Sequence, residues 1–114
     1  MVKVEIVKSL VLNIKKRFSN AEANEIIDLL YTIKENPKKG KLLGSVGGII
    51  IKELKYKGFR FYFLADGYKI KIFSNEELTD LLLKFVRMSD KKHQQKVINE
   101  IRQILISIGP EGFK

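Results

Sequence analysis

Four side chains with types suited to phosphate binding and proton transfer stand in or beside apolar segments of this sequence: Glu53, Arg60, Arg87 and His93. Guanidinium groups match phosphate oxygens two at a time, whereas carboxylates and imidazoles can accept or donate protons. A two-residue period would place Glu53 on one strand face and Arg60 with Tyr62 on one face of the next strand. These charges would equally suit the solvated face of an antiparallel sheet, and the pattern alone leaves both interpretations open.

Other chemistries lack the residues that they need. The chain has one histidine and no cysteine, so we expect no metal site, no thiol nucleophile and no Ser-His-Asp arrangement. The stretch Gly44-Ser-Val-Gly47-Gly48 lacks the Lys-Ser/Thr pair of a phosphate-binding loop. If the protein is an enzyme, the sequence predicts that it works without a cofactor.

The positive charge is concentrated in two segments. The net charge is +9, and residues 36–60 hold seven basic and one acidic residue, while residues 84–102 hold six and two. This distribution is typical of a nucleic-acid-binding surface. The alternative is a lysine-rich composition of the source, because only four of the 22 basic residues are arginine. The predicted RNA-binding residues are Lys38, Lys39, Lys41, Lys52, Lys55, Lys57, Lys84, Lys91 and Lys92.

The first third of the chain shows helical signals after a short strand. Residues 2–7 alternate and predict a strand, and apolar residues from Leu10 to Phe18 follow a helical spacing. Ser19 and Glu22 form a capping box that predicts the start of a second helix, which Asn36-Pro37 ends. Residues 36–48, rich in Lys, Gly and Pro, are predicted to be a loop.

The remainder reads as strands followed by one helix. We expect a hairpin at Asp66-Gly67, an acidic connection from Asn75 to Asp80, and a last helix capped by Ser89 or Asp90 and stopped by Gly109-Pro110. The predicted strands span 49–56, 59–65, 68–73 and 81–88. The order βααββββα predicts one α+β domain over residues 1–114, with an antiparallel sheet packed against an N-terminal helical hairpin and a C-terminal helix.

The cytoplasm is the expected compartment. The first eight residues alternate charged and apolar side chains and so lack the apolar core of a signal peptide. No apolar run approaches the ~20 residues of a membrane span. We therefore expect no membrane partner.

Three segments resemble motifs of the RelE/ParE toxin superfamily, and most closely those of RelE-like or HigB-like toxins of the archaeal type. They are Glu53-Leu-Lys55, then Gly58-Phe-Arg60-Phe-Tyr62-Phe, then Phe85-Val-Arg87-Met-Ser before an amphipathic helix. The resemblance covers nearly the whole chain, including the order of elements. Departures include Lys55, where the family commonly has arginine, an acidic hairpin extension and additional C-terminal residues.

The resemblance implies a metal-independent endoribonuclease that cleaves mRNA, on the ribosome, and is neutralised by an antitoxin. It implies that Arg60 contacts the scissile phosphate and that Arg87 is the second basic residue. His93 falls where many members have a general acid, and Glu53 where some have a base. Without its antitoxin the protein is expected to be a monomer or a weak dimer.

Two other functions remain open from the sequence. One is a ParE-like toxin that binds its target without cutting nucleic acid. The other is a basic RNA- or DNA-binding module that uses the same fold. Four of these residues also have a purely structural interpretation. Glu53 would be an ion-pair partner, Arg87 a plain helix-start residue, and His93 a surface residue without a function. Tyr62 would be a core residue, which we favour over a base-stacking platform.

Overall fold

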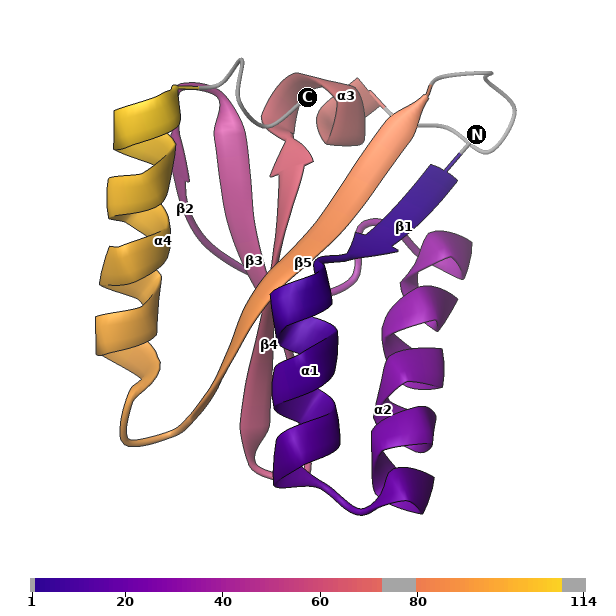
Figure 1. Cartoon of the computed structure of the whole chain (residues 1–114). Coiled ribbons are helices and arrows are strands. Elements are labelled where there is room, and N and C mark those ends of the chain that lie inside the picture. The colour runs from indigo at the N-terminus through magenta and orange to yellow at the C-terminus, as the bar shows by residue number, and fades with distance from the viewer. Residues whose placement is uncertain (1, 73–79, 110–114) are drawn as a thin grey trace.

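The computed structural model describes residues 2–72 and 80–109, which form one five-stranded sheet with helices on both of its faces (Figure 1). The strand order is β1-β5-β4-β3-β2; β1 runs parallel to β5, and the other neighbours are antiparallel. The elements are β1 (Val2–Ile6), α1 (Lys8–Arg17), α2 (Asn20–Tyr31), a 3-10 turn η1 (Thr32–Glu35), β2 (Lys41–Val46), β3 (Ile49–Tyr56), β4 (Phe59–Asp66), α3 (Gly67–Ile72), β5 (Leu81–Asp90) and α4 (Gln94–Ile108).

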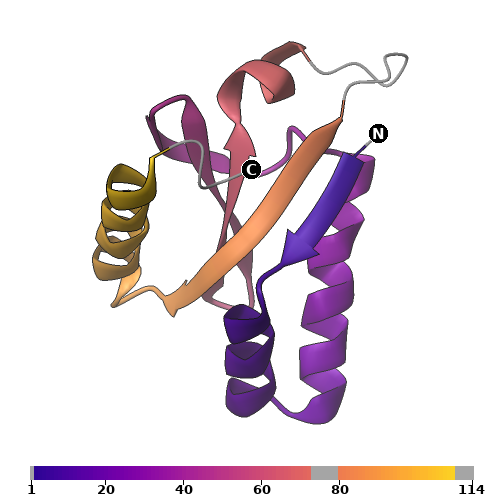
Figure 2. The same ribbon diagram turned by 45° about the horizontal axis from the view of Figure 1, so that its top comes forward.

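Two apolar clusters lie on opposite sides of the sheet. Helices α1 and α2 cover one face, and α4 covers the other, as the turned view shows (Figure 2). Strand β4 supplies both clusters by alternation: Phe61 and Phe63 face α1 and α2, whereas Tyr62 and Leu64 face α4. The separate helices and the mainly antiparallel sheet confirm the predicted α+β class, with the parallel β1–β5 pair as the exception to the predicted antiparallel sheet. None of the helices in the described ranges is long and apolar enough to span a membrane.

The prediction of a loop over residues 36–48 was wrong for its second half. Residues Lys41–Val46 form β2, which pairs with β3 along the edge of the sheet. The strand is hard to recognise in the sequence because it is largely exposed, and its pairing with β3 shifts register between Leu42 and Gly44. A Cβ atom at Gly44 would overlap the guanidinium of Arg102 from α4, and Arg102 Nη2 lies 3.4 Å from the neighbouring Leu43 carbonyl oxygen.

The predicted hairpin at Asp66-Gly67 and the predicted strand over 68–73 were also wrong. Residues Gly67–Ile72 form the helix α3, and residue 73 lies outside the described residues. The Asp66 carboxylate explains the difference, because its Oδ1 accepts the backbone N–H groups of Tyr68 and Lys69, each at 3.0 Å. Asp66 therefore caps a helix instead of starting a turn. The predicted acidic connection, apart from Asp80, also lies outside the described residues.

The last helix begins later than its predicted cap. Ser89 and Asp90 belong to β5, and α4 starts at Gln94. Asp90 still accepts a backbone N–H, from His93 at 2.8 Å, so it closes the turn between strand and helix. The predicted helix end is confirmed: Gly109 has a φ of 71°, and its N–H bonds to the Leu105 carbonyl.

The predicted cap of α2 is confirmed and gives a testable stability effect. Ser19 Oγ accepts the backbone N–H of Glu22 at 3.2 Å and donates to its carboxylate at 3.0 Å. We expect Ser19→Ala to lower the free energy of unfolding by about 1 kcal/mol, because one helix N–H loses its protein partner. Urea denaturation of both proteins measures this, and Ser9→Ala in α1, outside any cap, is the control. An unchanged midpoint for Ser19→Ala would contradict the capping role.

Candidate nucleic-acid interface

Buried polar side chains cluster on the face of the sheet that α4 covers. Strand register places Glu53 opposite Tyr62, and Arg60 opposite both Lys55 and Ser89. Glu53 is 5% exposed and Arg60 is 7% exposed, although both side chains carry ionisable groups. Ionisable residues are rarely buried to this degree without a partner, so these two require an explanation.

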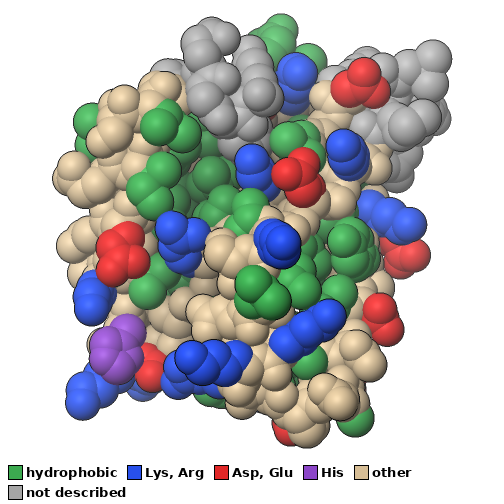
Figure 3. Space-filling view, in the orientation of Figure 1, with side chains coloured by type: hydrophobic (Ala, Val, Ile, Leu, Met, Phe, Trp, Pro, Cys, Tyr) green, Lys and Arg blue, Asp and Glu red, His purple; other side chains and the backbone are tan. Residues whose placement is uncertain are grey.

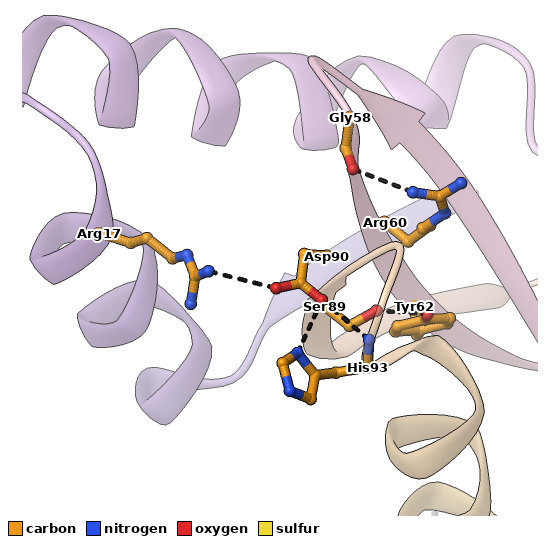
Figure 4. A network of polar contacts seen from close by, with 7 residues as sticks. All are labelled: Arg17, Gly58, Arg60, Tyr62, Ser89, Asp90 and His93. Atoms are coloured by element: carbon orange, nitrogen blue, oxygen red, sulfur yellow. Dashed lines mark hydrogen bonds and ion pairs between the residues drawn. The ribbon is translucent and has the colours of Figure 1, made fainter.

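Part of this cluster has unmatched hydrogen-bonding atoms. Glu53 Oε2 and Arg60 Nε are buried and have no hydrogen-bond partner among the described residues. Arg60 does use Nη1, which donates to the Gly58 carbonyl at 3.0 Å (Figure 4). Each unmatched buried polar atom costs about 1–3 kcal/mol. Such atoms require an explanation, and a functional role is one of them.

Tyr62 and Ser89 form the buried base of the cluster. Their hydroxyl groups lie 2.7 Å apart and share a hydrogen bond. Burial raises the pKa of the Tyr62 hydroxyl, and the bond to Ser89 partly offsets the effect. Tyr62 is fully buried, which confirms its interpretation as a core residue. Sequence reasoning missed Ser89 as its partner, because the pairing depends on the register between β4 and β5.

Arg87 lies on β5 opposite Tyr62, beside an irregularity in the β4–β5 pairing. Its Nη1 donates to the neighbouring Val86 carbonyl at 2.9 Å. The side chain is half-buried and borders two hollows, one against α4 and one against the start of α1. The hollow against α4 has a volume of about 180 Å³ and a mainly apolar lining. Figure 3 shows the corresponding hydrophobic side chains between α4 and β5.

His93 is held away from Arg60. Its Nδ1 lies 2.8 Å from Asp90 Oδ1, while Asp90 Oδ2 lies 3.6 Å from Arg17 of α1. Figure 4 shows the imidazole turned toward Asp90 and away from the Arg60 guanidinium. Hydrogen bonds from the backbone and then the side chain of His93 lower the pKa of Asp90. The structure therefore does not bring His93 into the cluster of Glu53 and Arg60. Sequence reasoning missed the contacts that join His93 to Asp90 and Asp90 to Arg17.

The lysines predicted to bind RNA occupy several places. Lys39, Lys41 and Lys55 border one hollow together with Glu53. Two others form long ion pairs. Lys57 Nζ lies 3.9 Å from Glu22 Oε2, and Lys84 Nζ lies 3.9 Å from Glu5 Oε1. Lys38, Lys91 and Lys92 are exposed, the last two in the turn before α4.

Lys52 differs from the other lysines because it is buried. It is 6% exposed, its Nζ donates to the Lys38 carbonyl at 2.9 Å, and the ammonium lies 5.7 Å from the centre of the Phe63 ring. Burial lowers the pKa of this ammonium. Its hydrogen bond attaches the basic stretch at Lys38 to the sheet.

We expect the pH dependence of stability to report on Lys52. Because the folded protein holds this proton less tightly than the unfolded chain, its contribution to stability rises with pH from the lowered pKa up to the ordinary value of 10.5. Lys52→Met should remove that alkaline rise while keeping most of the packing. Urea denaturation between neutral and alkaline pH measures this, with Lys55→Met, exposed on the same strand, as the control. Parallel pH curves for Lys52→Met and wild type would contradict the assignment.

Comparison with solved structures assigns the arrangement of strands and helices to the RelE-like fold. The chain is similar to a chain in the crystal structure of the archaeal RelE–RelB complex from Pyrococcus horikoshii OT3, with a TM-score of 0.56 and 14% sequence identity. The match covers 79% of this chain and 94% of the other. No protein-family model and no curated protein sequence matches the chain.

Proposed function

We propose that this chain is a RelE-like toxin that acts on RNA in the cytoplasm and is neutralised by an antitoxin. One observation carries the proposal: Glu53 and Arg60 are buried on the α4 face of a RelE-like sheet with polar atoms unmatched. A guanidinium and a carboxylate held in this way suit a polyanion that also carries hydroxyl and amino groups. RNA has this composition, and the basic surroundings favour its approach.

The proposed activity is metal-independent cleavage of mRNA. In such a reaction the 2′-OH loses its proton and attacks the adjacent phosphorus, the bond to the 5′ oxygen breaks, and that oxygen takes up a proton. Arg60 and Arg87 are proposed to stabilise the charge that develops on the phosphate oxygens. The remaining predicted roles are a base at Glu53 and an acid at His93, and the latter requires His93 to leave Asp90.

The proposed protein partner is an acidic antitoxin. The solved neighbour was crystallised as a RelE–RelB complex, and this chain has the same fold together with a net charge of +9. An acidic segment laid across the sheet would cover the basic surroundings of Arg60 and Arg87 and would keep RNA away.

Induced expression with primer extension on cellular mRNA tests the proposed function. We expect new 5′ ends within minutes of induction, at reproducible positions in several transcripts, and their disappearance when the antitoxin is co-expressed. Testing the purified protein on naked mRNA and on translating ribosomes then determines whether cleavage requires the ribosome. The absence of new 5′ ends, with the protein expressed and folded, would contradict cleavage.

A second candidate function is a toxin that binds its target without cutting it. The positions of His93, bound to Asp90, and Arg60, bound to the Gly58 carbonyl, favour this candidate. Growth arrest on induction without new mRNA 5′ ends would support it over a ribonuclease.

A further inference from the structure

A basic hollow lies at the edge of the sheet where β2 begins. The pairing of β2 with β3 starts at Lys41 opposite Glu53, and β3 continues past this point to Tyr56. The hollow that results has a volume of about 300 Å³, at the lower end of the size of small-ligand sites. It is lined by Lys39, Gly40, Lys41, Glu53, Leu54 and Lys55.

The lining of the hollow combines basic side chains with a carboxylate. Lys39, Lys41 and Lys55 are exposed and bring positive charge to the hollow, whereas Glu53 is buried and has an unmatched Oε2. Within the described ranges, none of these lysines forms an ion pair with Glu53. A ligand that satisfies the whole lining must carry both an anionic group and a hydrogen-bond donor. A nucleotide has both, in its phosphate and in the edge of its base.

The basic side of the hollow is held in place. Lys52 Nζ donates to the Lys38 carbonyl at 2.9 Å. This bond attaches Lys38, the residue before the first lining residue, to β3. Gly40 has a φ of 102°, and a Cβ there would lie 3.0 Å from the Glu53 carbonyl oxygen and 3.1 Å from the Phe63 ring. The chain therefore passes close against the sheet, which fixes the backbone on the basic side of the hollow. The Glu53 carboxylate has to turn toward the hollow to meet a ligand, because its Oε2 is buried.

We infer that this hollow binds one nucleotide of the RNA and that Glu53 selects its base. The inference rests on the proposed function and gives Glu53 a role in specificity instead of proton abstraction, so the 2′-OH proton passes to a water molecule. An ionised carboxylate only accepts hydrogen bonds. Guanine offers two adjacent donors, cytosine and adenine offer one amino group each, and the single N–H of uracil is flanked by two carbonyl oxygens that the carboxylate repels. Guanine should therefore bind best and uracil worst.

The location of Arg60, the arginine proposed to contact the cleaved phosphate, is consistent with this role of Glu53. Arg60 does not line the hollow; its guanidinium bonds to Gly58, toward the β3–β4 turn. Glu53 instead shares the hollow with three lysines, which suit the phosphate groups of a nucleotide beside the cleaved bond. Base selection and proton abstraction then predict different results for Glu53→Gln: the first changes which nucleotide binds, and the second lowers the cleavage rate for every sequence.

Titration of the full-length protein with GMP, AMP, CMP and UMP, followed by NMR, tests the inference. We expect GMP to bind at least about tenfold more tightly than UMP, the discrimination of a good carboxylate–base pair. Glu53→Gln should bring the GMP/UMP ratio of Kd values close to one, because an amide both donates and accepts. Glu25→Gln, exposed on α2, should keep the wild-type ratio. Lys39→Ala with Lys41→Ala should weaken all four nucleotides without changing the ratio.

Several outcomes would overturn the inference. Equal affinity of the wild type for GMP and UMP is one, and an unchanged ratio in folded Glu53→Gln is another. If Glu53→Gln fails to fold, the wild-type shifts decide, since GMP must perturb Lys39, Gly40 and Lys55 and not another surface. mRNA cleavage by a protein that binds none of the nucleotides would refute the inference alone. A protein that neither binds nucleotides nor cleaves mRNA would refute both the inference and the proposed function.

Discussion

Arg60→Ala should reduce mRNA cleavage by about 10²–10³-fold, as expected when a preorganised positive charge is removed from a developing oxyanion. Arg60 is buried on the α4 face, and its Nε has no hydrogen-bond partner among the described residues. Once the guanidinium becomes exposed to RNA, this N–H can donate to a phosphate oxygen. Arg60→Lys should also be defective, because an ammonium cannot reproduce the two-pronged contact of a guanidinium. Quantitative primer extension after induction, at matched protein levels, measures the effect.

The controls separate chemistry from folding. Arg60 is buried, so each variant needs a thermal unfolding curve, and a variant that remains folded at the growth temperature is informative. Lys15→Ala with Lys16→Ala, exposed on the outer side of α1, removes positive charge elsewhere and should cleave as the wild type does. Full cleavage by folded Arg60→Ala would exclude this residue from the reaction and would favour a binding toxin.

The triple replacement of Lys38, Lys39 and Lys41 by alanine should weaken RNA binding for every sequence. Each lysine that contacts a phosphate of single-stranded RNA releases about 0.7 counterion. Three lost contacts should therefore flatten the slope of log K against log salt by about 2, and at about 0.1 M salt lower the affinity by about 10²-fold. Fluorescence anisotropy with a labelled RNA over a salt series measures both quantities.

The matched control is again the pair Lys15 and Lys16, whose replacement should leave the salt slope nearly unchanged. The triple variant should also keep the order of base preferences, because the lysines contact the backbone of any sequence. A wild-type salt slope in the triple variant would mean that the stretch from Lys38 to Lys41 lies away from bound RNA.

The central strands could be predicted because their apolar residues alternate between two buried faces. The bounds of β3 were predicted correctly, and β4 ends at Asp66, one residue later than predicted. Edge strand β2 and helix α3 could not be predicted in this way. The first is exposed and takes its pairing from β3, and the second depends on the Asp66 carboxylate, which suits a turn and a helix cap equally well.

The candidate site was predictable where it depends on local spacing. The two-residue period places Glu53 and Arg60 on their strand faces, and the register brings them to the same side of the sheet. The partners of Tyr62 and His93 could not be predicted, because the Tyr62–Ser89 bond depends on strand register. The contact of Asp90 with Arg17 depends on how α1 packs beside the end of β5. A single sequence does not contain these distances.

The parallel pairing of β1 with β5 has a consequence for the synthesis of this protein. Val2 lies opposite Leu81, so the first strand finds its partner only after most of the chain has been made. Contacts between residues so distant in sequence form slowly, because a long loop must close first. The antiparallel hairpin of β3 and β4 is local and can form earlier. The sheet that carries Glu53 and Arg60 is therefore completed late, only after β5 has been made.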